Sequence, residues 1–188
     1  MAATNGALTG IRIADFSHVV AGPVCTMLLA DHGAQVIKVE RPVVGDMRRG
    51  FSIFPDDGIS VDASGGFHQI NRNKASLALN VTTASGREVA TQLIGLCDVV
   101  VENFAAGVMH TLGLGYEALC AVKPDIVVFS MPAAGLYGPL RDVRTYGLSL
   151  TSTTGLELLV VTSEQINCSA CRQRNESVKN DIIPHNPG

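Results

Sequence analysis

The chain has 188 residues and a formal net charge of −3, with 46% hydrophobic and 16% charged residues. This apolar share predicts a folded chain, since disordered chains combine low hydrophobicity with high net charge. Without a basic excess, general nucleic-acid binding through phosphate contacts is excluded. No apolar run reaches the length of a membrane span, which is about 18 residues. The first ten residues lack the basic and apolar regions of a secretory signal. We therefore expect a soluble, cytoplasmic protein that binds neither nucleic acid nor a membrane.

The first forty residues predict a strand, a helix and a second strand. Residues 11–16 alternate apolar and polar side chains, as a half-buried strand does. Pro23 suits the first turn of the following helix, and Gly33 suits its C-terminal cap. Residues 35–40 (QVIKVE) are rich in β-branched side chains, which favour a strand. Such a βαβ unit has parallel strands.

The alternation of strands and helices continues to residue 130. Residues 41–66 are rich in Gly and Pro and predict a long loop, of the kind that is usually functional or mobile. Further elements are predicted as strands at 74–80, 98–104 and 125–130, a helix at 82–97, and one or two short helices at 107–122. Alternating units of this kind indicate an α/β fold with an open sheet.

The last residues differ from the rest in composition. Residues 163–188 contain four Asn against five in all preceding positions, and they show neither helical nor strand periodicity. This pattern predicts a disordered terminus, or residues foreign to the fold, as after a reading-frame change or an alternative exon, and we favour the second. We accordingly divide the chain into a folded part, 1–160, and an atypical, disordered tail, 161–188.

The five cysteines do not indicate a function. Cys25, Cys97 and Cys120 lie in apolar stretches, which is typical of small buried hydrophobic residues. Cys168 and Cys171 form one CxxC without a second pair at zinc spacing and without the strand–helix context of a thioredoxin-like site. We therefore predict no metal centre.

Polar groups follow three of the predicted strands, where ligands bind in an open α/β sheet. Residues 17–22 lead into a helix, whose free N–H groups and dipole favour an anion such as phosphate. Lys38, Glu40 and Arg41 can meet a ligand after the second strand, Arg by bidentate contact with phosphate. Residues 71–74 and 102–104 add polar atoms and an aromatic ring that can stack on a base. Together these groups predict a nucleotide-like site.

Several details keep this prediction open. The chain has neither GxGxxG nor GxxxxGK[ST], which excludes an ordinary dinucleotide site and a P-loop. His18 is about equally typical of a structural histidine and of a ligand contact. We interpret Arg48 and Arg49 as members of a solvated loop.

Six segments in register resemble the amino-terminal half of a class III CoA-transferase. They are LTGIRIADFSHVVAGPVCTMLLADHGAQVIKVERP, GDMRRG, NRNKASLALN, GREVA, DVVVENF and the following AAGVMHTLGLGYEAL. That family includes formyl-CoA and carnitine CoA-transferases and is related to the α-methylacyl-CoA racemases. The resemblance runs from about residue 8 to about residue 157. It implies a Rossmann-like open, mainly parallel sheet with flanking helices, as part of the family's large domain.

The resemblance also implies which residues contact coenzyme A at the strand ends. Carried over position by position, the contact residues are His18, Val19, Ala21, Arg41, Lys74, Asn103, Phe104 and Arg144. Arg41 would lie near the adenosine-phosphate end, and Arg41 and Lys74 would meet phosphates. Thr111 departs from the family, where a basic residue is common. Coenzyme A or an acyl-CoA is expected as a substrate, with no permanently bound cofactor.

The catalytic residues stay unassigned. In the transferases an aspartate forms mixed anhydrides with the acyl groups and so passes CoA between carboxylic acids. That aspartate follows the position of Gly147, where this chain has its tail, and the nearest carboxylates there, Glu176 and Asp181, do not match the pattern. The racemases use a His/Asp pair, and Gly147 stands where that Asp would be.

Three functions therefore remain as alternatives. The first is a CoA-transferase of which this chain supplies the CoA-binding part, inactive by itself; the others are a racemase-like isomerase and a non-catalytic CoA-binding fragment. The partners expected for the first are an acyl-CoA and a carboxylic acid. Intact family members form interlocked homodimers, and we expect this chain to lose the interlock because it lacks the segments that close it.

Overall fold

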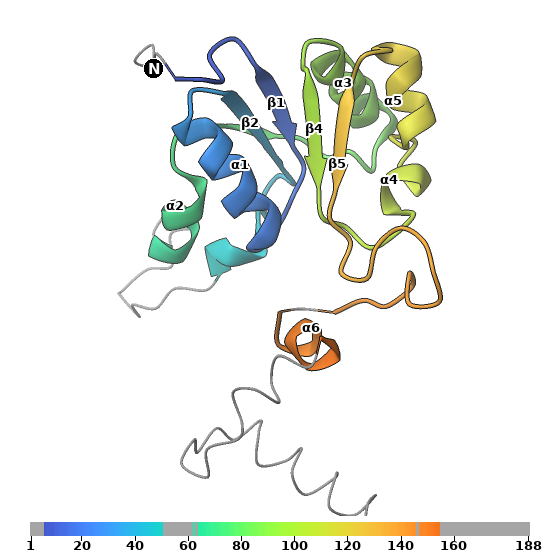
Figure 1. Ribbon diagram of the computed structural model, residues 1–188. Coiled ribbons are helices and arrows are strands. Elements are labelled where there is room, and N and C mark those ends of the chain that lie inside the picture. The colour runs from blue at the N-terminus through green and yellow to red at the C-terminus, as the bar shows by residue number, and fades with distance from the viewer. Residues whose placement is uncertain (1–5, 51–61, 63, 146, 155–188) are drawn as a thin grey trace, which may run out of the picture. The chain divides into compact units, whose positions relative to one another are not determined.

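The computed structural model describes residues 6–50, 62, 64–145 and 147–154 (Figure 1). The chain divides into one unit of residues 1–144 and a second of residues 145–188. The first unit holds a sheet with its helices, and the described part of the second holds the short helix α6 (Gly147–Thr153). The predicted boundary at residue 160 and the tail fall outside the described residues.

The sheet has five strands, and every neighbouring pair in it is parallel. The strands are β1 (Arg12–Asp15), β2 (Gln35–Glu40), β3 (Lys74–Ala78), β4 (Val99–Glu102) and β5 (Val127–Ser130). Their spatial order is β3-β2-β1-β4-β5, with a reversal of winding between β1 and β4. This order confirms the Rossmann-like open α/β fold, in which ligands bind beside the carboxyl ends at that reversal.

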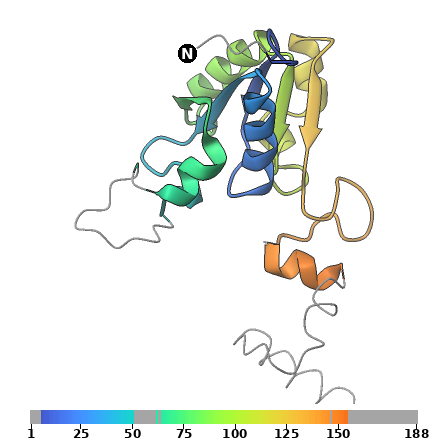
Figure 2. The same ribbon diagram turned by 60° about the vertical axis from the view of Figure 1, so that its left-hand side comes forward.

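Helices cover both faces of the sheet (Figures 1 and 2). One face is packed by α1 (Ala21–Asp31), and α2 (Gly65–Asn71) lies against α1. The other face carries α3 (Ala84–Gly95), α4 (Val108–Thr111) and α5 (Tyr116–Val122). A single turn of 3-10 helix, η1 (Met47–Gly50), follows β2. Among the described residues, no helix is long and apolar enough to cross a membrane.

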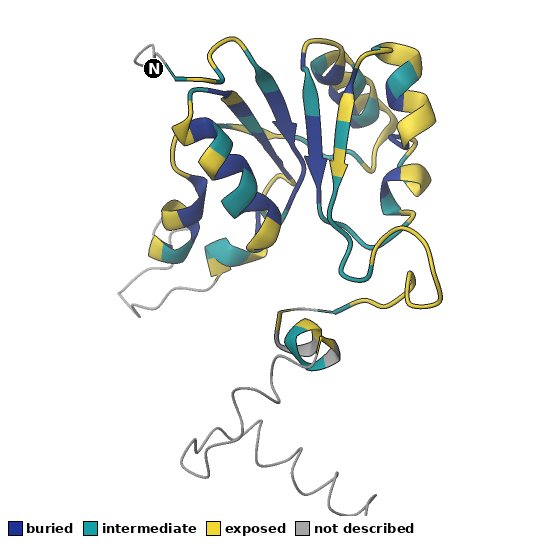
Figure 3. Cartoon of the chain, in the orientation of Figure 1, coloured by how far each residue is buried: buried dark blue, intermediate teal, exposed yellow. Residues whose placement is uncertain are grey.

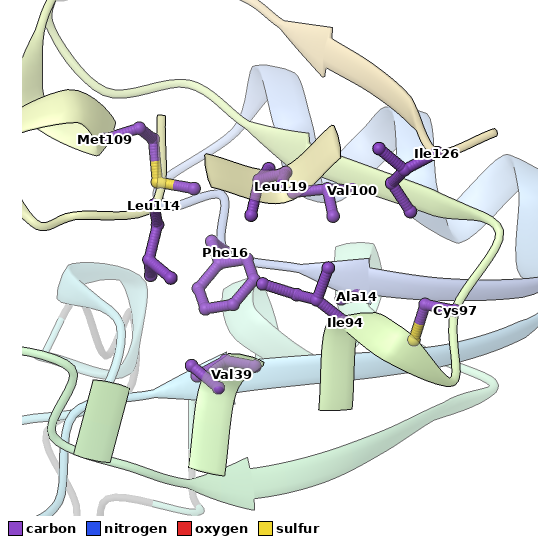
Figure 4. Packing of buried hydrophobic residues seen from close by; sticks show 11 residues of the cluster. Ala14, Phe16, Val39, Ile94, Cys97, Val100, Met109, Leu114, Leu119 and Ile126 are labelled. Carbon is purple, nitrogen blue, oxygen red and sulfur yellow. The ribbon is translucent and has the colours of Figure 1, made fainter. Parts of the chain in front are cut away.

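Alternating side chains of the strands supply two apolar clusters. Ile13 and Val36 pack with Ala30 of α1 on one face. Ala14, Phe16 and Val100 belong to the larger cluster on the other face, which Figure 4 shows around the Phe16 ring. The burial pattern follows, with the central strands buried and the edge strand β5 exposed at alternate positions (Figure 3). Alternation with period two is what the predicted strands required.

The structure confirms the predicted strands with shifts of up to two residues at their ends, and it adds helices that the sequence did not predict, α2 and α6 among them. Residues 65–66 fall in the predicted loop 41–66 and residues 67–71 in no predicted element, and Gly65 and Gly66 are both poor helix formers. One local contact and one tertiary contact stabilise α2 there. The hydroxyl of Ser64 accepts a hydrogen bond from the Phe67 N–H, and the Phe67 ring is buried. Capping and packing therefore override a weak local propensity.

Truncation of the larger cluster should destabilise the fold. Ile94 of α3 is fully buried, so Ile94→Ala removes apolar contacts and leaves a cavity. We expect the free energy of unfolding to fall by about 2–5 kcal/mol in urea titration. Val89 on the same helix is 42% exposed, and Val89→Ala should change the free energy of unfolding by less than about 1 kcal/mol. Equal effects of the two substitutions would contradict the assigned faces of α3.

Candidate functional site

The candidate site lies where β1 and β4 end and α1 begins. The backbone N–H of Phe16 still donates to the Val101 carbonyl, 2.8 Å away, so the two strands stay paired up to this point. The chain then turns through residues 17–20, here called the β1–α1 loop, and enters α1 at Ala21. Val20 provides no side-chain cap for α1. The N–H groups of the first turn therefore have no capping side chain, as at an anion-binding helix end.

Asn103 fastens this loop to the end of β4. Its side-chain carbonyl accepts the His18 N–H at 2.7 Å, and its amide donates to the His18 carbonyl at 2.8 Å. The ring of His18 lies 5.4 Å from that of Phe104, centroid to centroid and tilted by 46°. Three of the predicted contact residues thus come together from two strand ends.

The loop contains a strained backbone position, and it packs against a glycine at the start of α1. Any other residue at that glycine would displace the loop or the helix. Val19 has a φ of 68°, in the left-handed region that β-branched residues rarely occupy. A Cβ on Gly22 would lie 2.1 Å from the Cβ of Ser17, so the first turn of α1 packs directly on the loop. Strain of this kind persists only where surrounding contacts determine the conformation.

Two buried lysine–aspartate pairs lie below the loop, on the α1 face of the sheet. Lys38 Nζ is 3.0 Å from Asp46 Oδ2 and also donates to the Ser17 carbonyl at 2.8 Å. Lys74 Nζ is 3.1 Å from Asp15 Oδ2. Both lysine side chains are only 2% exposed and both aspartates are fully buried. Buried charges require such partners, because desolvation of an unpaired ion is very unfavourable.

A third pair joins the end of β2 to η1. Arg49 binds the Glu40 carboxylate through Nε and Nη2, each at 2.8 Å, and its guanidinium lies 3.6 Å above the Phe67 ring. Glu40 also accepts the backbone N–H of Asp46 at 3.0 Å. The segment after β2 is thereby tied to both β2 and α2.

These contacts shift the ionisation of the buried groups. Burial works to raise the pKa of Asp46, but the Lys38 cation and hydrogen bonds outweigh it and hold that pKa below its ordinary value. Burial lowers the pKa of Lys74 to about 8, against the opposing pull of Asp15. Burial and then the Lys38 cation lower the pKa of His18 below 6.5. The imidazole of His18 is therefore neutral at pH 7.

The other predicted contacts are distributed differently. Ala21 is exposed as the first residue of α1. Arg41 is exposed just after β2, has no side-chain partner among the described residues, and lines an open hollow of about 170 Å³. Arg144 is exposed in the segment that follows β5, and no contact in the described part of the chain joins it to the loop.

The structure does not support a phosphate contact by Lys74. Its ammonium group donates to Asp15, to the Pro23 carbonyl at 2.9 Å and to Asn71 at 2.8 Å, which uses all three of its hydrogens. Lys38 is likewise buried and committed to internal partners, so it does not face a ligand as the sequence suggested.

The interpretation of Arg48 and Arg49 as solvated was wrong. The side chain of Arg49 is 13% exposed and paired, and Nε of Arg48 is buried without a hydrogen-bond partner within the described ranges. Asp46 was missed as a central residue of the site. The signal available was its place in GDMRRG, six positions after Glu40 and shortly after a strand that carries Lys38 and Glu40 among apolar residues. Over the described ranges, no cluster of three or more His, Cys, Asp or Glu could hold a metal ion.

Acidification should destabilise the protein through His18. Because its folded pKa is lowered from 6.5, the unfolded chain binds the proton more readily. Its contribution to stability is complete above pH 6.5 and decreases as the pH falls below that value. In urea titrations, the free energy of unfolding should fall less between pH 6.5 and about 5 for His18→Gln than for the unsubstituted chain. His110→Gln, at an exposed position on α4, is the control; equal slopes in all three proteins would contradict this role.

Comparison with known proteins identifies a family for most of this chain. Residues 8–170 match the model of CoA-transferase family III. The chain is 44% identical over 171 residues to a formyl-CoA:oxalate CoA-transferase from Bradyrhizobium diazoefficiens, covering 87% of this chain and 39% of that protein. An acyl-CoA transferase from Fusarium pseudograminearum is 42% identical over 166 residues, which cover 86% of this chain and 36% of that protein.

A solved structure shares the fold. It is a CAIB/BAIF family protein from Brucella suis, with a TM-score of 0.74 and 34% identity, over 80% of this chain and 40% of that one. The chain thus spans about two fifths of the length of the relatives that it matches. With a family model matched over most of its length, this chain belongs to CoA-transferase family III.

Proposed function

We propose that this chain is the coenzyme A-binding part of a CoA-transferase that moves CoA from an acyl-CoA to a carboxylic acid. The observation that carries the proposal is the likeness, at 44% identity over 87% of this chain, to a formyl-CoA:oxalate CoA-transferase. The relatives' names make formyl-CoA and oxalate the first donor and acceptor to assay.

The geometry supplies three kinds of contact suited to a CoA thioester. The uncapped start of α1 favours a phosphate. The tilted rings of His18 and Phe104 form an amphipathic surface, with the His18 side chain 29% exposed. The guanidinium of Arg41 is exposed beside an open hollow and can bind phosphate in bidentate fashion. These groups would bind and orient the coenzyme.

In the intact protein we propose an acyl anhydride on an aspartate as the intermediate. The carboxylate attacks the thioester carbonyl, the new C–O bond replaces the C–S bond, and CoA leaves as thiolate. The racemase alternative would show instead as exchange of the α-proton of an acyl-CoA. An interlocked homodimer and a cytoplasmic location stay predictions for the intact protein.

We propose that the 188-residue chain by itself does not catalyse transfer. Its buried carboxylates at the site are committed to internal partners: Asp15 and Asp46 to buried lysines, Glu40 to Arg49, and Glu102 to the backbone N–H of Phe104. A carboxylate held in a buried ion pair is a poor nucleophile, since it is neither exposed nor free to approach a thioester. Glu176 and Asp181 lie outside the described residues.

The binding proposal predicts a loss of affinity in Arg41→Ala. A charge-assisted hydrogen bond contributes about 1.5–3 kcal/mol, so titration calorimetry with CoA should show affinity lower by at least about tenfold. Arg87→Ala is the control, because that arginine lies on α3 and donates to the Thr82 carbonyl. Unchanged affinity in Arg41→Ala would remove Arg41 from the site, and absence of CoA binding by the unsubstituted chain would contradict the proposal.

The proposed inactivity is tested by trapping the intermediate. The chain is incubated with formyl-CoA and oxalate, and hydroxylamine is added to convert any activated carboxyl group to a hydroxamate. We expect no product CoA thioester and no modified carboxylate by mass spectrometry, because attack needs a carboxylate free to approach within about 3–3.5 Å of the thioester, and Asp15, Asp46 and Glu40 are held in ion pairs. An adduct that forms at the rate of turnover would show that the chain carries its own nucleophile.

A further inference from the structure

We propose that Lys38 and Asp46 are positioning residues of the site: together they hold the β1–α1 loop in the shape that presents His18 to the coenzyme. The coenzyme part of this statement rests on the proposed function. The loop's shape and the environment of His18 are independent of that function and can be measured without a ligand.

Lys38 and Asp46 hold the loop at two points from the side of β2. Lys38 donates to the carbonyl of Ser17, the first residue of the loop, at 2.8 Å. The carboxylate of Asp46 accepts the N–H of Val19 at 3.2 and 3.3 Å from its two oxygens. The ion pair of 3.0 Å connects these two contacts. Asn103 holds the residue between them, His18, from the side of β4.

The conformation that the pair holds is one that the loop would not adopt alone. Val19 is in the left-handed region, which disfavours a β-branched side chain. Its N–H meets the Asp46 carboxylate in that conformation, and the hydrogen bond is charge-assisted. A buried ion pair is often no more stabilising than apolar residues of the same volume. Its value here is the geometry that it imposes on the loop.

The same pair sets the charges that His18 meets. Asp46 Oδ2 is 3.8 Å from His18 Nδ1, beyond hydrogen-bonding distance. The charged groups facing the imidazole are Lys38, which favours its neutral form, and Asp46, Asp15 and Glu40, which favour its protonated form. Burial and Lys38 prevail, so the ring stays neutral and can donate or accept one hydrogen bond with a ligand.

The first experiment is an NMR titration of the His18 ring in the full 188-residue chain, with the signal assigned through His18→Gln. Lys38→Met removes a cation and should raise the pKa of His18. Asp46→Asn removes an anion, keeps an oxygen for the Val19 N–H, and should lower it. Loss of structure would move the pKa toward 6.5 in both variants, so shifts of opposite sign identify the direct electrostatic role. Lys123→Met, which breaks a pair with Asp98 at the opposite end of the sheet, is the control and should cause no shift.

The second experiment separates positioning from stability. Lys38→Met alone leaves the Asp46 charge buried and without its cation, whereas the double variant Lys38→Met/Asp46→Asn removes both charges of this pair and leaves neither partner unpaired. We expect the double variant to regain most of the lost thermal stability. Its affinity for CoA should nevertheless stay about tenfold below that of the unsubstituted chain, because the Ser17 carbonyl has lost its donor.

The outcomes distinguish the two proposals. If the unsubstituted chain binds no CoA while the His18 shifts have opposite signs, the proposed function fails and the placement of both charges beside His18 stands. Shifts of the same sign, or none in folded variants, overturn the positioning role. If Lys38→Met does not fold, Asp46→Asn and the double variant provide the test. Recovery of CoA affinity together with stability in the double variant would also overturn the positioning role.

Discussion

Charge buried at the carboxyl edge of the sheet is the constraint on which the site depends. Three ion pairs, Lys74–Asp15, Lys38–Asp46 and Arg49–Glu40, lie under the β1–α1 loop and the segment after β2. Removing either partner of such a pair would leave an uncompensated charge in a low-dielectric interior. The strands, the loop and η1 therefore keep their relative positions in order to keep these charges paired.

Strand β2 contributes to both the apolar core and the candidate site from the same face. In β2, Val36 packs in the apolar cluster beneath α1, and two residues later, on the same face, stands Lys38. Glu40 follows at the end of the strand and binds Arg49. On this face, β2 is thus held by apolar contacts near its amino end and by polar contacts toward its carboxyl end. Because parallel strands all end at that edge, the polar groups of four strands and loops converge there.

Much of the fold was predictable because it depends on local patterns. The alternation in 11–16 and the β-branched run in 35–40 predicted β1 and β2, and the βαβ spacing predicted their parallel pairing. By contrast, α2 was not predicted, because it opens with two glycines and its Phe67 ring is buried only once the surrounding chain is folded. The convergence of His18, Asn103 and Phe104 was foreseen from strand ends and from the family resemblance. The roles of Lys38, Lys74 and Asp46 were not.

The fold class, the succession of elements and the edge of the candidate site could be predicted from the residues alone, because periodicity is a local property of the chain. Which charged side chain is exposed and which is an internal partner depends on how distant segments pack together. Lys74 and Arg41 illustrate the difference: Lys74 is the first residue of β3 and Arg41 directly follows β2, yet the Lys74 ammonium group is buried against Asp15 and the Arg41 side chain is exposed. Ionic partners are chosen by distance and burial between residues far apart in sequence, here 59 positions for Lys74 and Asp15, and no local pattern encodes that separation.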